Sequence, residues 1–331
     1  MKEQNRKSEK VLNGKCLYTP GGAAREYAAV GCNFYRGCPY QCRYCYNRTG
    51  ITAKVMGVDH AVLKDEFTSL CKRPKKYSEL SGEEYAYMRF LQEVEKWKDY
   101  LCKTGIFFSF STDPLCDDAF DLTWKCVKFA TKEYGIPVKI LTKNADFSAQ
   151  QMLLFDMVPM EHRKLMAFGF TLTGRDDWEP YAPKNIERVR MMRILHDMGF
   201  KTFASIEPIV DFESSYQMIE KTAKFCDQYL IGLMSSRKAN GLDSYDVDVC
   251  KDFICKVHEL MWRDYVPGKL HNNRRIYWKE SIRKMMENEV VASVMKDGYS
   301  STGVGRDWSL FTGNLTYLWK QRIKPFMCGV R

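Results

Sequence analysis

The sequence predicts an α/β fold in which six β/α units form a barrel. Short apolar runs with β-branched and aromatic residues alternate with helical patterns for most of the chain. This alternation is typical of βαβ units around a parallel sheet. Two of the helical patterns also stop at a glycine, Gly135 and Gly199, and glycine is the residue that helix C-caps favour.

The predicted strands come in order along the chain, each followed by a helical segment. They span residues 31–35, 106–111, 137–142, 166–173, 201–206 and 228–233. An apolar run at 275–278 would add a further strand to the same sheet. The helices between the strands show apolar residues at helical spacing. One is marked by Phe120, Trp124 and Val127, a second by Ile186, Val189, Met192 and Leu195, and the others span 151–158, 215–226 and 247–264.

Two segments do not fit the β/α repeat. The first, residues 47–105, is interpreted as an insertion after the first strand. It carries a basic cluster (Lys72, Arg73, Lys75 and Lys76) and a long helix that opens with a capping box from Ser81 to Glu84. The second is the aromatic and basic tail, residues 296–331. The predicted organisation is an N-terminal extension over 1–30, a barrel over 31–235 with the insertion, and a C-terminal helical extension over 236–331.

The composition is that of an ordinary globular protein. The chain has 331 residues, a formal net charge of +10, 45% hydrophobic and 28% charged residues. No run approaches the roughly 18 apolar residues of a membrane span, and the polar start does not resemble a secretory signal. We therefore expect a cytoplasmic protein with no membrane partner and reduced cysteines. The positive charge is compatible with a polyanionic partner such as nucleic acid.

The strongest functional signal is a loop with three cysteines after the first predicted strand. Cys38, Cys42 and Cys45 stand in a CxxxCxxC arrangement. Thiolates this close in sequence can hold one metal centre, and soft thiolate ligands select zinc or an iron–sulfur cluster. Three ligands on a four-iron cluster leave one iron open for a substrate or cofactor. The alternative is a structural zinc site completed by Cys32 or Cys16 as the fourth thiolate.

These three cysteines, with the aromatic Tyr44 just before the last one, resemble the signature of the radical S-adenosylmethionine (SAM) superfamily. The resemblance implies a 4Fe-4S cluster held by Cys38, Cys42 and Cys45, with SAM bound at its unique iron. It implies reductive cleavage of SAM to a 5′-deoxyadenosyl radical, with an electron donor such as flavodoxin or ferredoxin. Tyr44 would lie near the adenine. The partial (β/α)6 barrel of the superfamily agrees with the six predicted units.

A closer resemblance is to spore photoproduct lyase-like proteins, which are often described as DNA repair photolyases. It rests on short motifs at consecutive strand ends, between about residue 18 and residue 233. They are Tyr35-Arg36-Gly37-Cys38 leading into Cys45-Tyr46, Ser111-Thr112-Asp113-Pro114, Leu141-Thr142-Lys143, Glu179-Pro180-Tyr181-Ala182-Pro183 and Ile206-Glu207-Pro208-Ile209.

The ends of the predicted strands also carry polar residues suited to a cofactor site. In a parallel barrel, functional residues gather at the carboxyl ends of the strands. These residues are Asp113, Lys143, Thr171, Thr173, Glu207 and Lys279. We expect the Asp113 carboxylate to accept hydrogen bonds from the SAM ammonium, and Lys143 to pair with the cofactor carboxylate. Thr171 or Thr173, with Glu207, would bind ribose hydroxyls. The alternative is that these residues cap helices or join salt bridges of the barrel.

One departure from the closer resemblance concerns the hydrogen donor. Spore photoproduct lyase uses a cysteine shortly before the equivalent of Asp113, and no cysteine stands at Phe110, Ser111 or Thr112. Cys116 is the nearest thiol and a candidate catalytic donor, although a cysteine near a helix start is more often inert packing. Cys250 and Cys255, at a spacing unlike that of auxiliary clusters, are interpreted as core residues.

Three classes of function are compatible with these features. The favoured hypothesis is a radical SAM enzyme acting on a nucleic acid or nucleotide, although the substrate rests on resemblance alone. A radical SAM enzyme that modifies peptides or proteins is the second. A non-catalytic zinc-binding or nucleic-acid-binding module is the third. The iron and sulfide content of the anaerobically purified protein separates the third class from the first two.

Overall fold

The structure is a computed structural model that describes residues 11–48, 53–235, 237–263 and 275–286. Its centre is an eight-stranded sheet of order β1-β2-β5-β6-β7-β8-β9-β10. Each neighbouring pair from β2 to β10 is parallel, and only β1 runs antiparallel to its neighbour. The strands are β1 Leu17–Tyr18, β2 Gly31–Cys32, β5 Ile106–Phe108, β6 Val138–Thr142, β7 Met166–Thr171, β8 Lys201–Ile209, β9 Gln228–Leu233 and β10 Arg275–Trp278. This mainly parallel α/β sheet is a partial barrel, as the sequence predicts.

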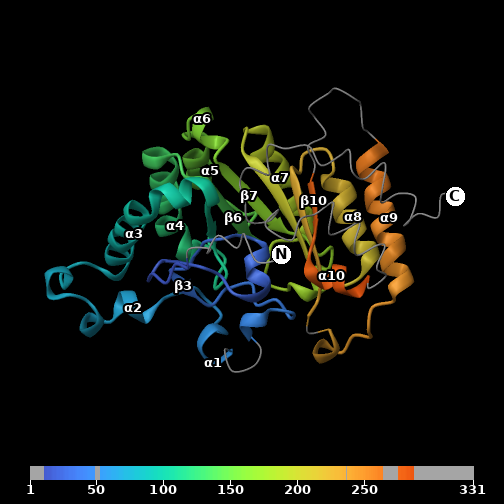
Figure 1. The fold of residues 1–331 in the computed structure, drawn as a ribbon, viewed down its shortest axis with the longest axis horizontal. Coiled ribbons are helices and arrows are strands. Elements are labelled where there is room, and N and C mark those ends of the chain that lie inside the picture. The colour runs from blue at the N-terminus through green and yellow to red at the C-terminus, as the bar shows by residue number, and fades with distance from the viewer. Residues whose placement is uncertain (1–10, 49–52, 236, 264–274, 287–331) are drawn as a thin grey trace, which may run out of the picture.

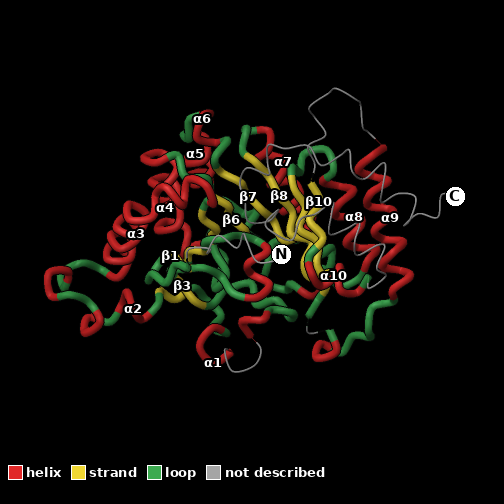
Figure 2. The backbone as a smooth tube through the Cα atoms, in the orientation of Figure 1, coloured by secondary structure: helices red, strands yellow, loops and turns green. Residues whose placement is uncertain are grey.

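Helices connect the parallel strands and lie on the outside of the sheet, while the strands fill the middle of the molecule (Figures 1 and 2). The longer helices are α3 Gly82–Thr104, α4 Asp117–Tyr134, α5 Ala149–Asp156, α7 Asn185–Asp197, α8 Phe212–Thr222 and α9 Val247–Arg263. The shorter ones are α1 Ala53–Met56, α2 Asp65–Thr68, α6 Met160–Arg163 and α10 Glu280–Met285. Gly135 follows α4 with φ of 63°, so the predicted glycine C-cap is confirmed there.

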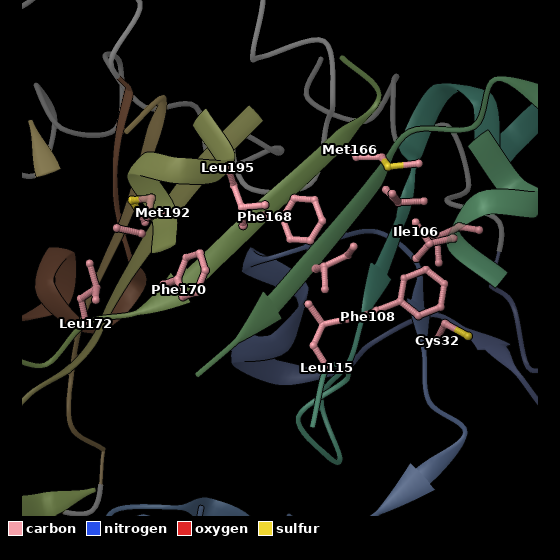
Figure 3. Packing of buried hydrophobic residues seen from close by; sticks show 14 of the residues in the cluster. Cys32, Ile106, Phe108, Leu115, Met166, Phe168, Phe170, Leu172, Met192 and Leu195 are labelled. Carbon is pink, nitrogen blue, oxygen red and sulfur yellow. The ribbon is translucent and has the colours of Figure 1, made fainter. Parts of the chain in front are cut away.

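The core between the sheet and the helices is apolar and aromatic. Phe108 of β5, Phe168 of β7 and Leu195 of α7 lie in it together (Figure 3). Trp124 of α4 contacts both Phe155 and Phe168 in edge-to-face or tilted geometry. Burying each such side chain contributes roughly 1.5–3 kcal/mol.

A smaller apolar layer fills the inner side of the sheet. Phe107, Phe203 and Leu230 belong to it, and they come from β5, β8 and β9. Gly169 of β7 makes room for the Phe203 ring, since a Cβ at position 169 would lie 2.1 Å from that ring. The interior is therefore packed at this level of the described sheet.

The first predicted strand, 31–35, is wrong as a single strand. β2 ends at Cys32, and Tyr35–Arg36 form β3, which pairs with β4 (Val62–Leu63) in a separate two-stranded sheet. The break lies at Asn33, whose Oδ1 accepts a hydrogen bond from Phe110 N at 2.8 Å. Its Nδ2 donates to the Tyr18 hydroxyl at 2.7 Å. These side-chain bonds take the place of sheet pairing and turn the chain toward the cysteine loop.

The segment interpreted as an insertion contains the first crossover. Helix α3 leads from β2 to the parallel strand β5, packs against α4, and opens with the predicted capping box. Arg73 of the basic cluster is buried and donates to the carbonyl oxygens of Phe67 and Leu80. Only Lys72, Lys75 and Lys76 of that cluster are exposed. Arg73 therefore braces this segment, and three lysines remain available to a partner.

Candidate functional site

A cavity of about 530 Å³ opens at the carboxyl ends of the parallel strands. Its wall on one side is the cysteine loop, and its floor is formed by strand ends. The residues predicted for the site that line it are Cys38, Cys42, Tyr44, Cys45, Asp113, Lys143, Thr171, Glu207 and Lys279. The structure thus brings together side chains from five separate strand ends and the loop. Its volume is in the range of small-molecule and cofactor sites.

The cysteine loop begins with a turn that only glycine suits. Gly37 has φ of 79°, and a Cβ there would lie 2.2 Å from a methyl of Val58 and 2.3 Å from the His60 carbonyl oxygen. Cys38 N donates to Val58 O at 3.1 Å, and Cys45 N donates to Cys42 O at 3.1 Å. These bonds turn the loop so that all three thiols line the cavity.

Cys42 is buried, Cys38 and Cys45 are partly exposed, and Lys143 is a cationic neighbour of both Cys38 and Cys42. Burial, with a smaller effect of Asp113, raises the pKa of the Cys38 thiol to about 12. Burial also raises the pKa of Cys42, while the Lys143 ammonium opposes that shift. A coordinated metal deprotonates thiols outright. This donor set therefore fits a group that supplies strong positive charge.

The zinc alternative needs a fourth thiolate close to the other three. Cys16 and Cys32 are fully buried and do not line the cavity. Their electrostatic neighbours include Glu93, Cys126 and Lys64, and none of the three loop cysteines is among them. Within the described ranges, no three His, Cys, Asp or Glu side chains are gathered tightly enough for a single metal ion. Neither Cys16 nor Cys32 is therefore placed to complete a four-thiolate site with the three cysteines of the loop.

The aromatic residue of the loop is tied to the segment after β7. The Tyr44 hydroxyl donates to Glu179 Oε1, and the neighbouring Arg43 N donates to Trp178 O at 3.0 Å. Glu179 forms an ion pair with Arg188 of α7, with 2.6 Å between the two atoms and both side chains fully buried. Burial alone disfavours the Glu179 carboxylate, but Arg188 and then Lys143 outweigh it, so its pKa is lowered.

Asp113 joins the loops that follow β5 and β6. Its Oδ1 accepts from the Thr142 hydroxyl at 2.6 Å and from Leu115 N at 3.0 Å. Its Oδ2 accepts from Lys143 N at 2.6 Å. Burial raises the pKa of this carboxyl, and these hydrogen bonds oppose the rise. Asp113 therefore has a structural role at the cavity wall, with one oxygen that accepts a single bond from the chain.

Lys143 lines the same cavity, close to Tyr44. Its Nζ is 5.6 Å from the centre of the Tyr44 ring, which is within range of a cation–π contact. Burial alone lowers the pKa of Lys143, but nearby Cys42 and Glu179 outweigh it, so the pKa is raised. The ammonium is thus held charged between the cysteine loop and the buried ion pair.

The other half of the floor, beneath β8–β10, is a hydrogen-bonded group around Glu207. Tyr27 OH and Lys279 Nζ each lie 2.6 Å from Glu207 Oε2. Tyr27 OH is also 2.7 Å from Ser205 Oγ, and Lys279 Nζ is 3.5 Å from Glu26 Oε2. Two carboxylates thus surround one buried ammonium at this end of the cavity.

Two predicted site residues lie away from the cavity lining. Thr173 is fully buried, and its hydroxyl donates to Glu179 Oε2 at 3.2 Å, so it supports the ion pair. Cys116 is the buried N-cap residue of α4 and lines a neighbouring pocket on the outer side of Tyr40. Neither reaches the space that the cysteine loop encloses. Cys116 has Asp113 and Cys38 as electrostatic neighbours although it does not line the cavity, and its catalytic role stays a prediction.

Sequence reasoning missed Tyr27, Ser205, Arg188 and Thr112. The first two come to the site from the segment before β2 and from mid-β8, and no spacing motif marks either. Thr112 lines the cavity and is 8% exposed. In the described part of the chain, its buried hydroxyl has no hydrogen-bond partner. An orphaned polar atom on a cavity-lining residue is a group that a bound polar cofactor would satisfy.

Comparisons with known proteins agree with this arrangement at the level of the fold. No protein-family model matches the chain. The uncharacterized protein MJ0683 of Methanocaldococcus jannaschii is 25% identical over 216 residues, which is 64% of this chain and 73% of that protein. Spore photoproduct lyase complexed with dinucleoside spore photoproduct aligns over 83% of this chain and 81% of its own, with 14% identity and a TM-score of 0.54. The chain has a radical SAM fold of the spore photoproduct lyase type.

Other solved structures were also found. A spore photoproduct lyase variant with bound AdoMet and dinucleoside spore photoproduct aligns with a TM-score of 0.54 and 12% identity. SuiB of Streptococcus suis aligns with a TM-score of 0.47 and 11% identity, and this chain spans half of SuiB's length. In the described ranges, no helix combines the length and apolar character that a bilayer crossing requires.

Proposed function

We propose that the chain is a radical SAM enzyme that holds a 4Fe-4S cluster through Cys38, Cys42 and Cys45. The observation that carries the proposal is the shared cavity: the three thiols face the strand ends that bear Asp113 and Lys143. The radical SAM fold and the orphaned Thr112 hydroxyl support it. When bound, the cluster would supply the electron that cleaves SAM to a 5′-deoxyadenosyl radical for hydrogen abstraction.

The chain's own residues would bind and orient SAM. Lys143 presents a positive charge suited to the cofactor carboxylate, and Asp113 Oδ2 has room for one more donor, which suits the ammonium. Tyr44 offers a fixed aromatic face for the adenine. Thr171 and Glu207, on neighbouring strands, present oxygens suited to ribose hydroxyls. The electron would come from a small carrier such as flavodoxin or ferredoxin.

We infer further that the substrate is a nucleic acid or a nucleotide. The support is the net charge of +10, the exposed lysines Lys72, Lys75 and Lys76, and the substrate named for the spore photoproduct lyase neighbour. Each phosphate that a lysine neutralises releases counterions and steepens the salt dependence of binding. The whole substrate assignment rests on these features, and a peptide substrate is the outcome that would replace it.

The test of the enzymatic proposal is anaerobic. The protein is reconstituted with iron and sulfide, then incubated with SAM and dithionite, and 5′-deoxyadenosine is measured by mass spectrometry. We expect a brown protein with about four irons per chain and time-dependent release of 5′-deoxyadenosine. A colourless protein that releases none after reconstitution would refute the proposal.

The substrate test measures DNA and RNA affinity at several salt concentrations. The variant with Lys72, Lys75 and Lys76 all changed to Ala should lower the slope of log K against log[salt] by up to about 0.9 per lost contact. The matched control changes Lys128, Lys221 and Lys224, which are exposed on or next to α4 and α8, and should leave the slope unaltered. Equal slopes for both variants would refute the basic segment as the nucleic-acid contact.

A further inference from the structure

The geometry points to a device that fixes the cysteine loop before any cofactor is bound: the buried Glu179–Arg188 ion pair, acting through Tyr44. We propose that these are positioning residues for Cys42 and Cys45, which flank Tyr44 in the sequence. The inference rests on the proposed function only in assuming that the cysteines hold the cluster. The ordering of the loop itself is a property of the metal-free chain.

The two carboxylate oxygens of Glu179 have different partners, and one of them bonds to Tyr44. Oε1 accepts from the Tyr44 hydroxyl. Oε2 accepts from Arg188 Nη2 at 2.6 Å, from Asn185 Nδ2 at 3.2 Å and from Thr173 Oγ1 at 3.2 Å. The carboxylate is therefore held on one side by three donors and presents its other side to the loop. Its acceptor position is set by the scaffold, not by the loop.

Arg188 connects this carboxylate to the rigid part of the fold. Its Nη1 donates to Thr171 O at the end of β7 at 2.6 Å, and its Nε donates to Pro183 O just before α7 at 2.8 Å. Both carbonyls belong to the frame that carries the cavity floor. A planar guanidinium with bonds on several edges cannot rotate without breaking them. Arg188 therefore fixes the Glu179 carboxylate relative to β7 and α7.

A contribution to folding stability alone does not explain why this ion pair is present. Both side chains are fully buried, and the cost of removing two charges from water largely offsets their attraction. What the pair supplies is a fixed, charged acceptor, and a hydrogen bond to a charged group is among the stronger ones. The backbone bond from Arg43 N to Trp178 O is a second tie at the same point of the loop.

The loop residue next to this bond is an arginine, the residue after which trypsin cleaves. Arg43 is exposed, and the bond after it leads directly to Tyr44. Cleavage there requires the loop to leave the cavity wall, so its rate in the native protein reports how often the tie opens. This readout needs no metal, no SAM and no substrate.

The experiment compares trypsin cleavage after Arg43 in iron-free wild-type protein, Tyr44→Phe and Glu179→Gln. Losing a hydrogen bond to a charged acceptor should raise the opening equilibrium, and so the cleavage rate, by about tenfold or more. Tyr44→Phe keeps the ring and removes only the hydroxyl. Wild-type cleavage rates in both variants would overturn the proposal.

The matched control is Arg163→Lys. Arg163 is a buried arginine at the end of α6 that donates to the carbonyls of Asp156, Val158 and Met198. Helix α6 lies on the side of the molecule away from α1 (Figure 1). The control variant should lower the stability to urea without changing cleavage after Arg43, whereas Arg188→Lys should change both. If Arg163→Lys accelerates cleavage after Arg43 as much as Arg188→Lys does, the effect is general loosening and the proposal fails.

A second readout follows reconstitution with iron. Tyr44→Phe and Glu179→Gln should alter the electron paramagnetic resonance line shape of the reduced cluster and raise the dissociation constant for SAM, while Arg163→Lys leaves both unchanged. Were wild-type protein to bind no iron, the proposed function would fail and the proteolysis result would still decide the ordering of the loop. The two failures are therefore distinguishable.

Discussion

Lys279 reaches past β9 to donate a hydrogen bond to Glu207, with 2.6 Å between Lys279 Nζ and Glu207 Oε2. Glu207 belongs to β8, and Lys279 follows β10, so the bond spans the strand between them. Gly232 of β9 makes the crossing possible. A Cβ at that position would lie 2.8 Å from Glu207 Oε1 and 3.0 Å from Lys279 Cδ.

We predict that Gly232→Ala destabilises the fold and displaces this bond. The added methyl meets two tightly held side chains, and overpacking of this kind typically costs about 1–3 kcal/mol. The measurement is the free energy of unfolding in urea. Gly21→Ala is the control, because a Cβ at Gly21 meets nothing within 4 Å. Equal stability of the two variants would contradict the crowding argument.

A second prediction concerns the cluster ligands. Replacing any one of Cys38, Cys42 or Cys45 by Ala should abolish cluster assembly, because two thiolates are too few anchors for four irons. Cys32→Ala should keep its iron, since Cys32 lies in the core and not at the cavity. Iron and sulfide analysis after anaerobic reconstitution checks both. Loss of metal in Cys32→Ala would instead support the alternative of a zinc site with four thiolates.

Asp113 is predicted to serve both the barrel and SAM. Asp113→Asn replaces one carboxylate oxygen by an NH2 group. In one orientation this group faces the donor Lys143 N, and in the other it faces the donors Thr142 Oγ1 and Leu115 N. The clash of donors should cost about 1–3 kcal/mol of stability. Asp113→Ala should retain the cluster and weaken SAM binding by about tenfold to a hundredfold.

The control for Asp113 is Asp117→Asn, since Asp117 is an exposed carboxylate in the first turn of α4. It removes one negative charge close to the site without touching those three donors. SAM titration followed by electron paramagnetic resonance, with urea unfolding in parallel, separates the two roles. Unaltered SAM affinity in Asp113→Ala, with reduced stability, would assign Asp113 to the barrel alone.

A pH-dependence follows from His258 of α9. Burial lowers its pKa from 6.5 to about 3, and its Nε2 accepts from Trp278 Nε1 at 3.1 Å. In the unfolded chain His258 is therefore protonated below about pH 6.5, whereas in the folded chain it stays neutral down to about pH 3. Folding stability should be lost as the pH falls through this window, by about 2 kcal/mol at pH 5 from this group alone.

The check is urea unfolding of the wild-type protein and of His258→Gln at about pH 7.5 and about pH 5. Glutamine keeps an acceptor for Trp278 and does not titrate. The variant should lose less stability between the two pH values than the wild-type protein loses. An identical loss in both proteins would show that other groups cause the acid sensitivity.

The sequence predicted the sheet well because strand and helix signals are local. The strands β6, β7 and β9 lie where apolar runs are bounded by turns and helical spacing. The break at Asn33 was not predicted because it depends on hydrogen bonds to Phe110 and Tyr18, which are distant in sequence. No pattern within a window of a few residues marks a side chain that will replace a sheet bond.

Site residues at the ends of predicted strands could be predicted from the sequence. Site residues that are recognised only by a partner distant in sequence could not. Asp113, Lys143 and Glu207 follow apolar strands, and all three line the cavity. Tyr27 meets Glu207 across 180 positions of sequence, and nothing in its own segment marks it. Cys116 shows the reverse case, since closeness in sequence to Asp113 did not place its thiol at the cavity.

The link between Tyr44 and Glu179 also sets an order of events during synthesis. The two residues are 135 positions apart. At roughly 5–20 residues per second, the cysteine loop leaves the ribosome on the order of ten seconds before its anchor does. Throughout that interval the loop has only its local bonds, such as Cys38 N to Val58 O, and lacks the bond from Tyr44 to Glu179. If the proposed cluster is inserted into a loop that Glu179 already holds, its insertion belongs to the period after residue 179 has been translated.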